Sequence, residues 1–224
     1  STQQHFTYGE RTNTRIYCGI IADNTYLYLG TDNGILIYNY RTDQYEQPDT
    51  DFPTDVRTMV LQGDTLWIGS LNGLYTYQLK SRQLNHFDSK QSGLSHNTIY
   101  SIIQTKDNQI YIGTYNGLCR YVQASGKFEN ILLPVNRGGS NLFVNSLLED
   151  TTRQCIWIGM EGYLFQYNPT TGEMKAIEVF HNNSIKSLAL DGDENLLAGT
   201  DNGLYVYQND KEPLQHIIHD SRNI

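Results

Sequence analysis

Five side chains able to bind a ligand recur at one position of a repeated strand. This variable column consists of Tyr17, Arg57, Tyr100, Asn145 and Lys186. An aliphatic residue precedes each of them and a small residue follows it. Aromatic rings can stack on a sugar, and Arg, Lys and Asn can donate hydrogen bonds to its hydroxyl groups. The sequence therefore predicts ligand contacts at the variable column. The alternative is that these residues pack neighbouring elements together and anchor loops.

Paired carboxylates, which acid–base catalysis would need, occur only in sequences typical of turns. The pairs are Asp49 with Asp51 and Asp191 with Asp193, and Asp favours turns because its side chain bonds the nearby backbone. The sequence contains no nucleophile motif and no group of His residues with metal-ligand spacing. We therefore predict no catalytic residue, no metal site and no cofactor for this chain. An enzyme that acts on glycans is the least favoured alternative.

The three cysteines, Cys18, Cys119 and Cys155, are an odd number without metal-ligand spacing. All three fall in segments that read as strands. We interpret them as small buried hydrophobic residues, with a disulfide or a reactive thiol as the alternatives. Cysteine usage does not fix the cellular compartment.

The elements that must position these side chains come in five copies of one phrase. Each copy is an apolar strand ending in Gly, a short turn, and a second strand whose Tyr stands eight residues after that Gly. The anchoring glycines lie 39, 44, 46 and 40 residues apart and are Gly30, Gly69, Gly113, Gly159 and Gly199. A period of roughly 40 to 45 residues made of short strands is typical of a β-propeller with one four-stranded blade per repeat. The sequence predicts an all-β propeller of four-stranded antiparallel blades, with five complete blades at approximately 15–48, 55–88, 97–132, 142–180 and 184–218.

The third blade shows the unit most clearly. Residues 97–103 alternate as an innermost strand, 110–113 form the second strand, 118–121 the third and 127–131 the outer strand. Asn116-Gly117 between the second and third strands predicts a type I′ hairpin. The fourth blade reads Met160-Glu-Gly-Tyr163 at this place, so we expect a different turn there.

The start of the chain predicts a further blade. His5-Phe6-Thr7 reads like His86-Phe87-Asp88 of the second blade's outer strand, so residues 1–8 are predicted to be the outer strand of another blade. Counting strands in this way favours a ring of six or seven blades, and a self-contained ring of five is the alternative.

Charge and hydropathy exclude several classes of partner. The chain has 16 basic and 24 acidic residues, a net charge of −8, and no basic cluster. Binding to nucleic acid or anionic lipid through phosphate contacts is therefore not expected. No apolar run approaches the ~20 residues that cross a bilayer. The first residues do not read as a signal peptide, so we expect a mature chain, a piece of a longer protein, or a cytosolic one.

The amino-acid pattern of the repeat resembles the two-component regulator propeller repeat. The third blade reads Leu94-Ser-His-Asn-Thr-Ile-Tyr-Ser-Ile102, then Ile110-Tyr-Ile-Gly-Thr-Tyr-Asn-Gly-Leu118 and Tyr121, and the phrase recurs through nearly the whole chain. This resemblance implies the periplasmic sensor region of an inner-membrane-anchored hybrid two-component histidine kinase, responding to oligosaccharides. It implies as partners an oligosaccharide or other small ligand, the remaining blades and signalling domains of the same polypeptide, and a homodimer. A protein-interaction or dimerisation platform is the alternative, and none of the six His residues is expected to accept a phosphoryl group.

Overall fold

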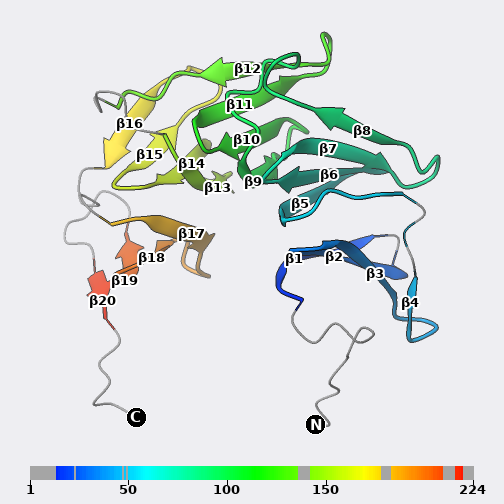
Figure 1. The fold of residues 1–224 in the computed structure, drawn as a ribbon. Helices are drawn as coiled ribbons and strands as arrows, with labels where there is room; N and C mark the ends of the chain where they lie inside the picture. The colour runs from blue at the N-terminus through cyan, green and yellow to red at the C-terminus, as the bar shows by residue number, and fades with distance from the viewer. Residues whose placement is uncertain are drawn as a thin grey trace. The chain divides into compact units, whose positions relative to one another are not determined.

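The computed structural model is all-β and is organised as five four-stranded antiparallel sheets (Figure 1). It describes residues 14–22, 24–46, 48, 50–135, 142–177, 183–208 and 215–218. Within these residues the chain forms twenty strands, and each sheet keeps its strands in chain order. The prediction of a propeller fold with five complete blades is confirmed. The predicted outer strand at residues 1–8 lies outside the described residues, and the ring of six or seven blades stays a prediction.

Each sheet is one repeat of the sequence. The first contains β1 (Ile16–Ala22), β2 (Tyr26–Thr31), β3 (Gly34–Asn39) and β4 (Gln44–Glu46). The second contains β5 (Val56–Gln62), β6 (Thr65–Ser70), β7 (Gly73–Gln78) and β8 (Leu84–Phe87). The third contains β9 (Ile99–Gln104), β10 (Ile110–Thr114), β11 (Gly117–Val122) and β12 (Lys127–Ile131). The fourth contains β13 (Val144–Asp150), β14 (Cys155–Met160), β15 (Leu164–Tyr167) and β16 (Met174–Ile177). The fifth contains β17 (Ile185–Leu190), β18 (Leu196–Thr200), β19 (Gly203–Tyr207) and β20 (Gln215–Ile217).

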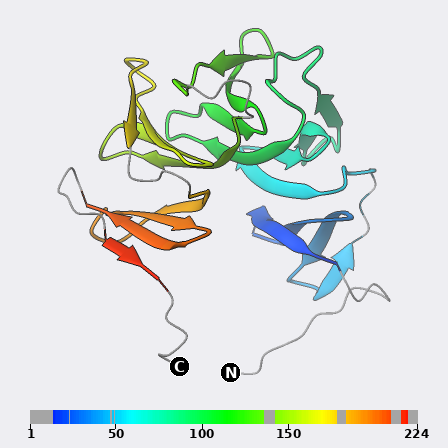
Figure 2. The same ribbon diagram turned by 60° about the vertical axis from the view of Figure 1, so that its left-hand side comes forward.

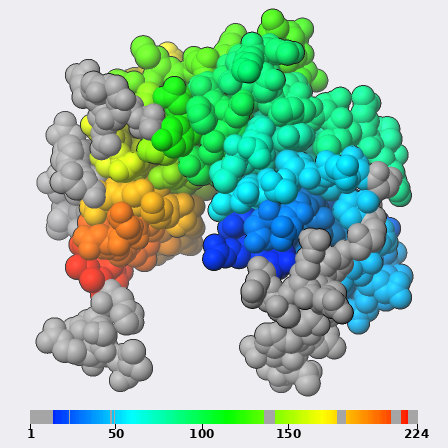
Figure 3. Space-filling model, in the orientation of Figure 1, coloured from blue at the N-terminus to red at the C-terminus, as the bar shows by residue number. Residues whose placement is uncertain are grey.

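The chain divides into two compact units. The first comprises residues 1–87 with 97–99, and the second comprises residues 88–96 with 100–224. In the first unit, β5 packs against β1 and β2. In the second unit, β13 packs against β10 and against β17, and the surfaces of the β13–β16 and β17–β20 sheets, yellow to orange, are continuous in Figure 3. Each unit therefore has apolar clusters of its own.

In the third and fourth blades the second strand is the most deeply buried element. Every residue of β10 and of β14 is buried. Strands covered on both faces read as continuous apolar runs instead of alternating ones, which explains the phrase Ile-Tyr-Ile-Gly-Thr of β10 and Ile-Trp-Ile-Gly-Met of β14.

The hairpin between the second and third strands differs from the predicted type I′ turn. A type I′ turn needs positive φ at both central residues, yet the Asn of these hairpins does not have positive φ and the Gly that follows does. In the third blade the hydroxyl of Thr114 fixes the turn: its Oγ1 accepts the Asn116 N–H at 3.0 Å and donates to the Gly117 carbonyl at 3.0 Å. Positive φ values of 114°, 139°, 115° and 105° occur at Gly34, Gly73, Gly117 and Gly203. The same two hydroxyl bonds are made by Thr31, Ser70 and Thr200.

The fourth blade departs from this hairpin as its sequence predicts. Met160 stands where the other blades have Thr or Ser, so no hydroxyl is available, and Gly162 takes the positive φ of 77°. The Met160 N–H donates to the Tyr163 carbonyl at 2.9 Å in place of the hydroxyl bonds. The hairpin Gly, which lies one position earlier than in the other blades, therefore indicates a different turn.

None of the described segments forms a helix long and apolar enough to cross a membrane.

Candidate functional site

The variable column coincides with a β-bulge at the start of the first strand of a blade. In the second blade Val56 pairs with Ser70 and Thr58 with Gly69, so Arg57 has no residue opposite it. The same register shift skips Tyr17, Asn145 and Lys186. A bulge leaves its extra residue unpaired and redirects its side chain. These four positions therefore differ from their neighbours on the strand, which have a paired residue on the second strand.

The two columns that flank the bulge are fixed by packing on the strand-end glycines. An atom at the Cβ position of Gly69 would lie 2.6 Å from Thr58 Cγ2 and 2.7 Å from Ile99 Cγ2. The Gly is thus required because the small residue of its own blade and the aliphatic residue of the next blade both close on it. The column of small residues is small because it faces these glycines, and it consists of Cys18, Thr58, Ser101, Ser146 and Ser187.

In the first unit, Tyr17 and Arg57 form one group. The Arg57 guanidinium carbon lies 3.9 Å from the centre of the Tyr17 ring, a cation–π contact. Arg57 also donates to the Asp55 carboxylate at 3.2 Å. Its Nε is buried without a hydrogen-bond partner. The group thus combines an aromatic ring, a cation stacked on it and a buried donor without a partner.

In the second unit, Asn145 and Lys186 meet at one hydroxyl. The Asn145 amide donates to Ser184 Oγ at 3.2 Å, and Lys186 Nζ donates to the same oxygen at 2.8 Å. Ser184 is held in turn by its own N–H, which donates to the Asp201 carboxylate at 3.0 Å. An amide and an ammonium group are therefore positioned side by side.

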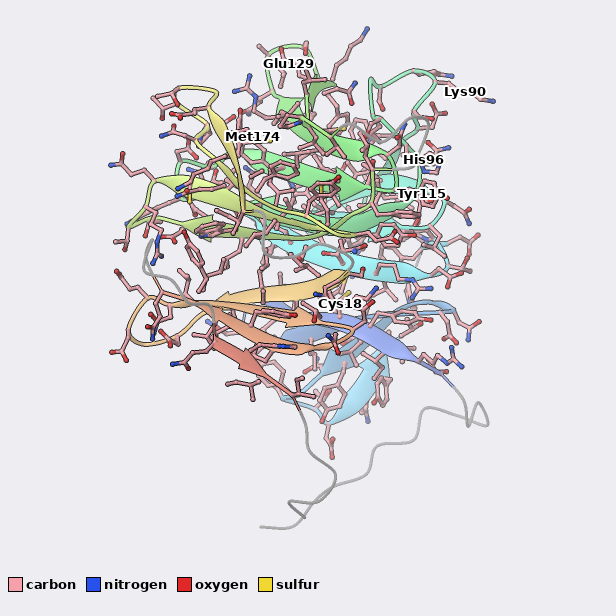
Figure 4. All side chains as sticks on the ribbon, turned by 90° about the vertical axis from the view of Figure 1, so that its left-hand side faces the viewer. Cys18, Lys90, His96, Tyr115, Glu129 and Met174 are labelled. Atoms are coloured by element: carbon pink, nitrogen blue, oxygen red, sulfur yellow. The ribbon has the colours of Figure 1, made fainter. Side chains whose placement is uncertain are left out.

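Tyr100 belongs to a separate aromatic group in the second unit. Its ring lies 6.3 Å from that of Phe143, which meets Tyr115 edge-on at 4.2 Å. His96 lies 4.9 Å from Tyr115, and both are marked together in Figure 4. Aromatic rings offer stacking surface at low conformational cost. The sequence prediction missed His96, Tyr115 and Phe143, although two of them precede a first strand and Tyr115 occupies the hairpin.

The structure therefore gathers the five predicted site residues into three groups. Tyr17 with Arg57 lies in the first unit, and Asn145 with Lys186 and Tyr100 with its aromatic neighbours lie in the second. Each group combines hydrogen-bond donors or aromatic rings. Ligand contact at these residues stays a prediction.

A cavity of about 440 Å³ lies at the other end of β13. Glu149 and Asp150 line it, but their carboxylates are already engaged. Both oxygens of Glu149 accept the Lys106 N–H, at 3.0 and 2.9 Å. Asp150 accepts from Trp157 Nε1 at 3.0 Å and from the Arg153 N–H at 2.9 Å. The carboxylates that line the cavity hold neighbouring turns through hydrogen bonds, so the variable column remains the better candidate for a ligand site.

Acidic and thiol groups take structural positions in the described part of the chain. Asp191 caps a turn, accepting the Asn195 side-chain amide at 2.9 Å and two backbone N–H groups. Hydrogen bonds from Asn195 lower its pKa. Asp49 lies outside the described residues. The searched residues contain no cluster of three or more His, Cys, Asp or Glu that could hold a metal ion.

The three cysteines are free thiols in strands, with Cys119 and Cys155 buried and Cys18 partly buried. Burial raises the pKa of Cys18 and of Cys155 to about 11 and also raises that of Cys119. Thiols with raised pKa are poor nucleophiles, which agrees with their interpretation as small buried residues.

One stretch of the chain, at the start of the third blade, matches the model of a known family. Residues 93–116, which include His96, Tyr100 and Tyr115, match the model of the two component regulator propeller. The chain carries the two-component regulator propeller repeat. The resemblance predicted from the phrase in the third blade is confirmed.

Solved structures and a curated relative extend this finding. The propeller is 78% identical, over 100% of its length, to an extracellular domain from B. thetaiotaomicron, with a TM-score of 0.95; that domain is described as part of a one component system in one crystal structure and of a hybrid two component system in another. A second extracellular domain of a hybrid two component system from B. thetaiotaomicron shares 18% identity over 98% of the chain with a TM-score of 0.77, which shows the fold. A histidine kinase of Formosa agariphila is 26% identical over 161 residues, 64% of this chain. This chain spans 30% of the first solved domain, 31% of the second and 11% of the kinase.

Proposed function

We propose that this propeller is a ligand-sensing part of the extracytoplasmic region of a hybrid two-component sensor. In this proposal it lies in the periplasm, anchored to the inner membrane through other parts of the polypeptide, and regulates a histidine kinase. Its partners are an oligosaccharide or other small ligand, further blades and signalling domains of the same polypeptide, and a second copy in a homodimer.

The observation that carries the proposal is the 78% identity to an extracellular domain over the full length of the chain. Identity at this level supports a shared role, whereas a propeller fold alone would not, since one fold hosts many functions. The match to a histidine kinase also supports a role in signalling.

The variable column supports an oligosaccharide as the ligand. Tyr17 and Tyr100 offer ring faces, and Arg57, Asn145 and Lys186 offer donors. Sugars present C–H faces that suit aromatic rings and hydroxyl groups that suit charged and amide donors. A column that varies while its two neighbours stay uniform suits a recognition role, because packing fixes only the neighbours.

Regulation follows only if the ligand distinguishes two conformations. A ligand shifts an equilibrium by no more than its difference in affinity for the two states. The pairs Tyr17 with Arg57 and Asn145 with Lys186 each join two blades of one unit, so an oligosaccharide bound to either pair would bias the packing of those two blades.

Calorimetric titration of the full-length ectodomain with a panel of oligosaccharides tests the proposal. We expect an oligosaccharide to bind at one of the groups, so that Arg57→Ala in the first unit or Lys186→Ala in the second weakens binding about tenfold or more, since a charge-assisted hydrogen bond contributes roughly 1.5–3 kcal/mol. Arg41→Ala and Lys127→Ala remove exposed cations outside the column and serve as matched controls.

Binding that falls equally in the controls would contradict a site at the variable column. An ectodomain that binds no member of the panel, and whose kinase output no oligosaccharide changes, would contradict oligosaccharide sensing.

A further inference from the structure

One hydroxyl between the fourth and fifth blades collects donors from both of them. The Asn145 amide in β13 and the Lys186 ammonium in β17 both donate to Ser184 Oγ, at 3.2 and 2.8 Å. Strand β17 packs against β13 and β14, and the two sheets lie next to each other in Figure 2, yellow above orange. Asn145 and Lys186 occupy the bulges of their strands, so the group joins two residues of the variable column through one buried hydroxyl.

The backbone around this hydroxyl is held from both blades. The Gly162 N–H in the hairpin of the fourth blade donates to the Asn183 carbonyl at 2.8 Å, and Glu161 forms an antiparallel bridge with Ser184. From the fifth blade, the Asp201 carboxylate accepts the Ser184 N–H at 3.0 Å, and the Asp201 N–H donates to the Ser184 carbonyl at 3.3 Å. The oxygen on which the two donors converge is therefore fixed before a ligand arrives, which lowers the entropic cost of binding.

The group has more donors than it uses. An ammonium group has three N–H donors and a side-chain amide has two, and Lys186 and Asn145 each spend one of them on Ser184 Oγ. Because this oxygen only accepts from both neighbours, the O–H of Ser184 is also left over. The described residues supply no acceptor for the remaining donors of these three side chains.

The charge of Lys186 is not compensated within the part of the chain that the structure describes. Glu161 and Asp201 flank Ser184 in the backbone pairing, but neither forms an ion pair with Lys186. The cation of the first unit differs, because Arg57 is paired with the Asp55 carboxylate at 3.2 Å. Of these two cations of the variable column, Lys186 is therefore the one that lacks an anion.

We propose that Asn145, Ser184 and Lys186 bind the carboxylate or sulfate of an acidic sugar unit. An anionic oxygen is the acceptor that these donors lack, and hydrogen bonds to a charged group are about twice as strong as neutral ones. The net charge of −8 does not exclude such a ligand, since exposed charges more than about 8 Å away are largely screened at physiological salt. The inference rests on the proposed sensing function and assigns its ligand to the acidic oligosaccharides.

Matched pairs of ligands test this assignment in calorimetric titrations of the full-length ectodomain. Oligosaccharides that contain glucuronate or galacturonate are compared with their carboxyl-reduced forms, and sulfated oligosaccharides with their desulfated forms. We expect an anionic member to bind about tenfold or more tightly than its neutral form, because it alone offers a charged acceptor. The two kinds of pair distinguish a carboxylate from a sulfate.

Substitutions of Lys186, which is exposed, locate the anion. Lys186→Gln should abolish the preference for the anionic form, since Gln still donates hydrogen bonds but carries no charge, and Lys186→Arg should keep it. Lys127→Ala removes an exposed cation of the same unit outside the group and is the matched control. A preference that survives Lys186→Gln, or that is lost equally on Lys127→Ala, would overturn the assignment.

The remaining outcomes separate this inference from the proposed function. An ectodomain that binds neutral oligosaccharides at least as tightly as their acidic forms would overturn the acidic class and leave oligosaccharide sensing intact. A preference lost on Arg57→Ala but not on Lys186→Gln would place the anion in the first unit, and would likewise overturn this inference alone. An ectodomain that binds no oligosaccharide of either kind would contradict both.

Discussion

At the strand-end glycines, no side chain larger than a hydrogen atom can be accommodated. At Gly159 the Ile185 Cγ2 atom would lie 2.6 Å from an added Cβ, and Ser146 Oγ would also collide with it. Overfilling a packed core of this kind typically costs about 1–3 kcal/mol. Glycine here is a packing residue, since its φ is not positive.

We therefore expect Gly159→Ala to lower the free energy of unfolding by about 1–3 kcal/mol in urea denaturation. Gly192→Ala, at a position with no neighbouring atom, is the control and should change stability little. Equal stability of the two variants would contradict the packing role of Gly159.

Asp150 is the most deeply buried carboxylate in the described residues, with a 0% exposed side chain in its ion pair with Arg153. Burial alone would raise its pKa, but hydrogen bonds from Trp157 and Arg153 outweigh burial and lower it below the usual 3.8. A carboxyl group whose pKa is lower in the folded state stabilises the fold above its unfolded pKa and loses that contribution as pH falls through the folded value.

Asp150→Asn should accordingly destabilise the chain at neutral pH by about 1–3 kcal/mol, since it removes a charged acceptor from buried donors. The difference from the wild type should shrink as pH falls below 3.8. Unfolding free energies measured by denaturant titration between pH 7 and pH 3 check this. A difference that stays constant over this range would show that Asp150 does not carry a lowered pKa.

At the scale of elements, the hydroxyl that follows the strand-end Gly in four of the five blades sets the hairpin. Thr114 is 0% exposed, and its Oγ1 bonds the backbone of both Asn116 and Gly117 and lies 2.8 Å from Ser95 Oγ. Removing it takes this partner from the part-buried Asn116 N–H and from the buried Gly117 carbonyl, which costs roughly 1–3 kcal/mol.

We expect Thr114→Val, which keeps the shape of the side chain, to destabilise the chain by about that amount in thermal or urea unfolding. Thr114→Ser keeps the hydroxyl, as Ser70 does naturally in the second blade, and should retain most of the stability. Loss of stability on Thr114→Ser as large as on Thr114→Val would contradict the role of the hydroxyl.

The elements themselves could be predicted because the repeat is periodic. A strand ending in Gly, a turn and a Tyr at a fixed distance recur five times, and local patterns of this kind determine strands and sheet order. The altered hairpin at Gly162 was also predictable, since its Gly moves within a short and strongly constrained loop.

Two features were not readable from the pattern. Asn-Gly predicts positive φ at both residues, but the neighbouring hydroxyl of Thr114 competes for the Asn116 N–H and selects another turn. The bulge at Arg57 depends on pairing between strands, which the alternation within one strand does not reveal. The variable column could be listed from sequence, whereas its division into three groups depends on contacts between blades.

At the scale of the whole molecule, the chain is an array whose blades contact their neighbours along the sequence. In such arrays stability is approximately a sum of terms for each repeat and each interface, and cooperativity can break down between parts. The two compact units each have their own apolar clusters. The cysteines report on them separately, because Cys18 belongs to the first unit and Cys155 to the second.

Thiol labelling across a urea series should show whether the two units of the unmodified chain open at different urea concentrations. Cys155 lies in β14, where all residues are buried, whereas β1 around Cys18 has one buried residue in seven. With a pKa of about 11 for both, roughly one thiol in a thousand is ionised at pH 8 in the folded state, so labelling awaits opening. We expect peptide mapping by mass spectrometry to show Cys18 labelled at a lower urea concentration than Cys155. Cys119, which lies in the same unit as Cys155, should be labelled at the same urea concentration as Cys155. Parallel labelling of all three would mean that the described blades unfold as one cooperative body, and would contradict the stepwise stability expected of this array.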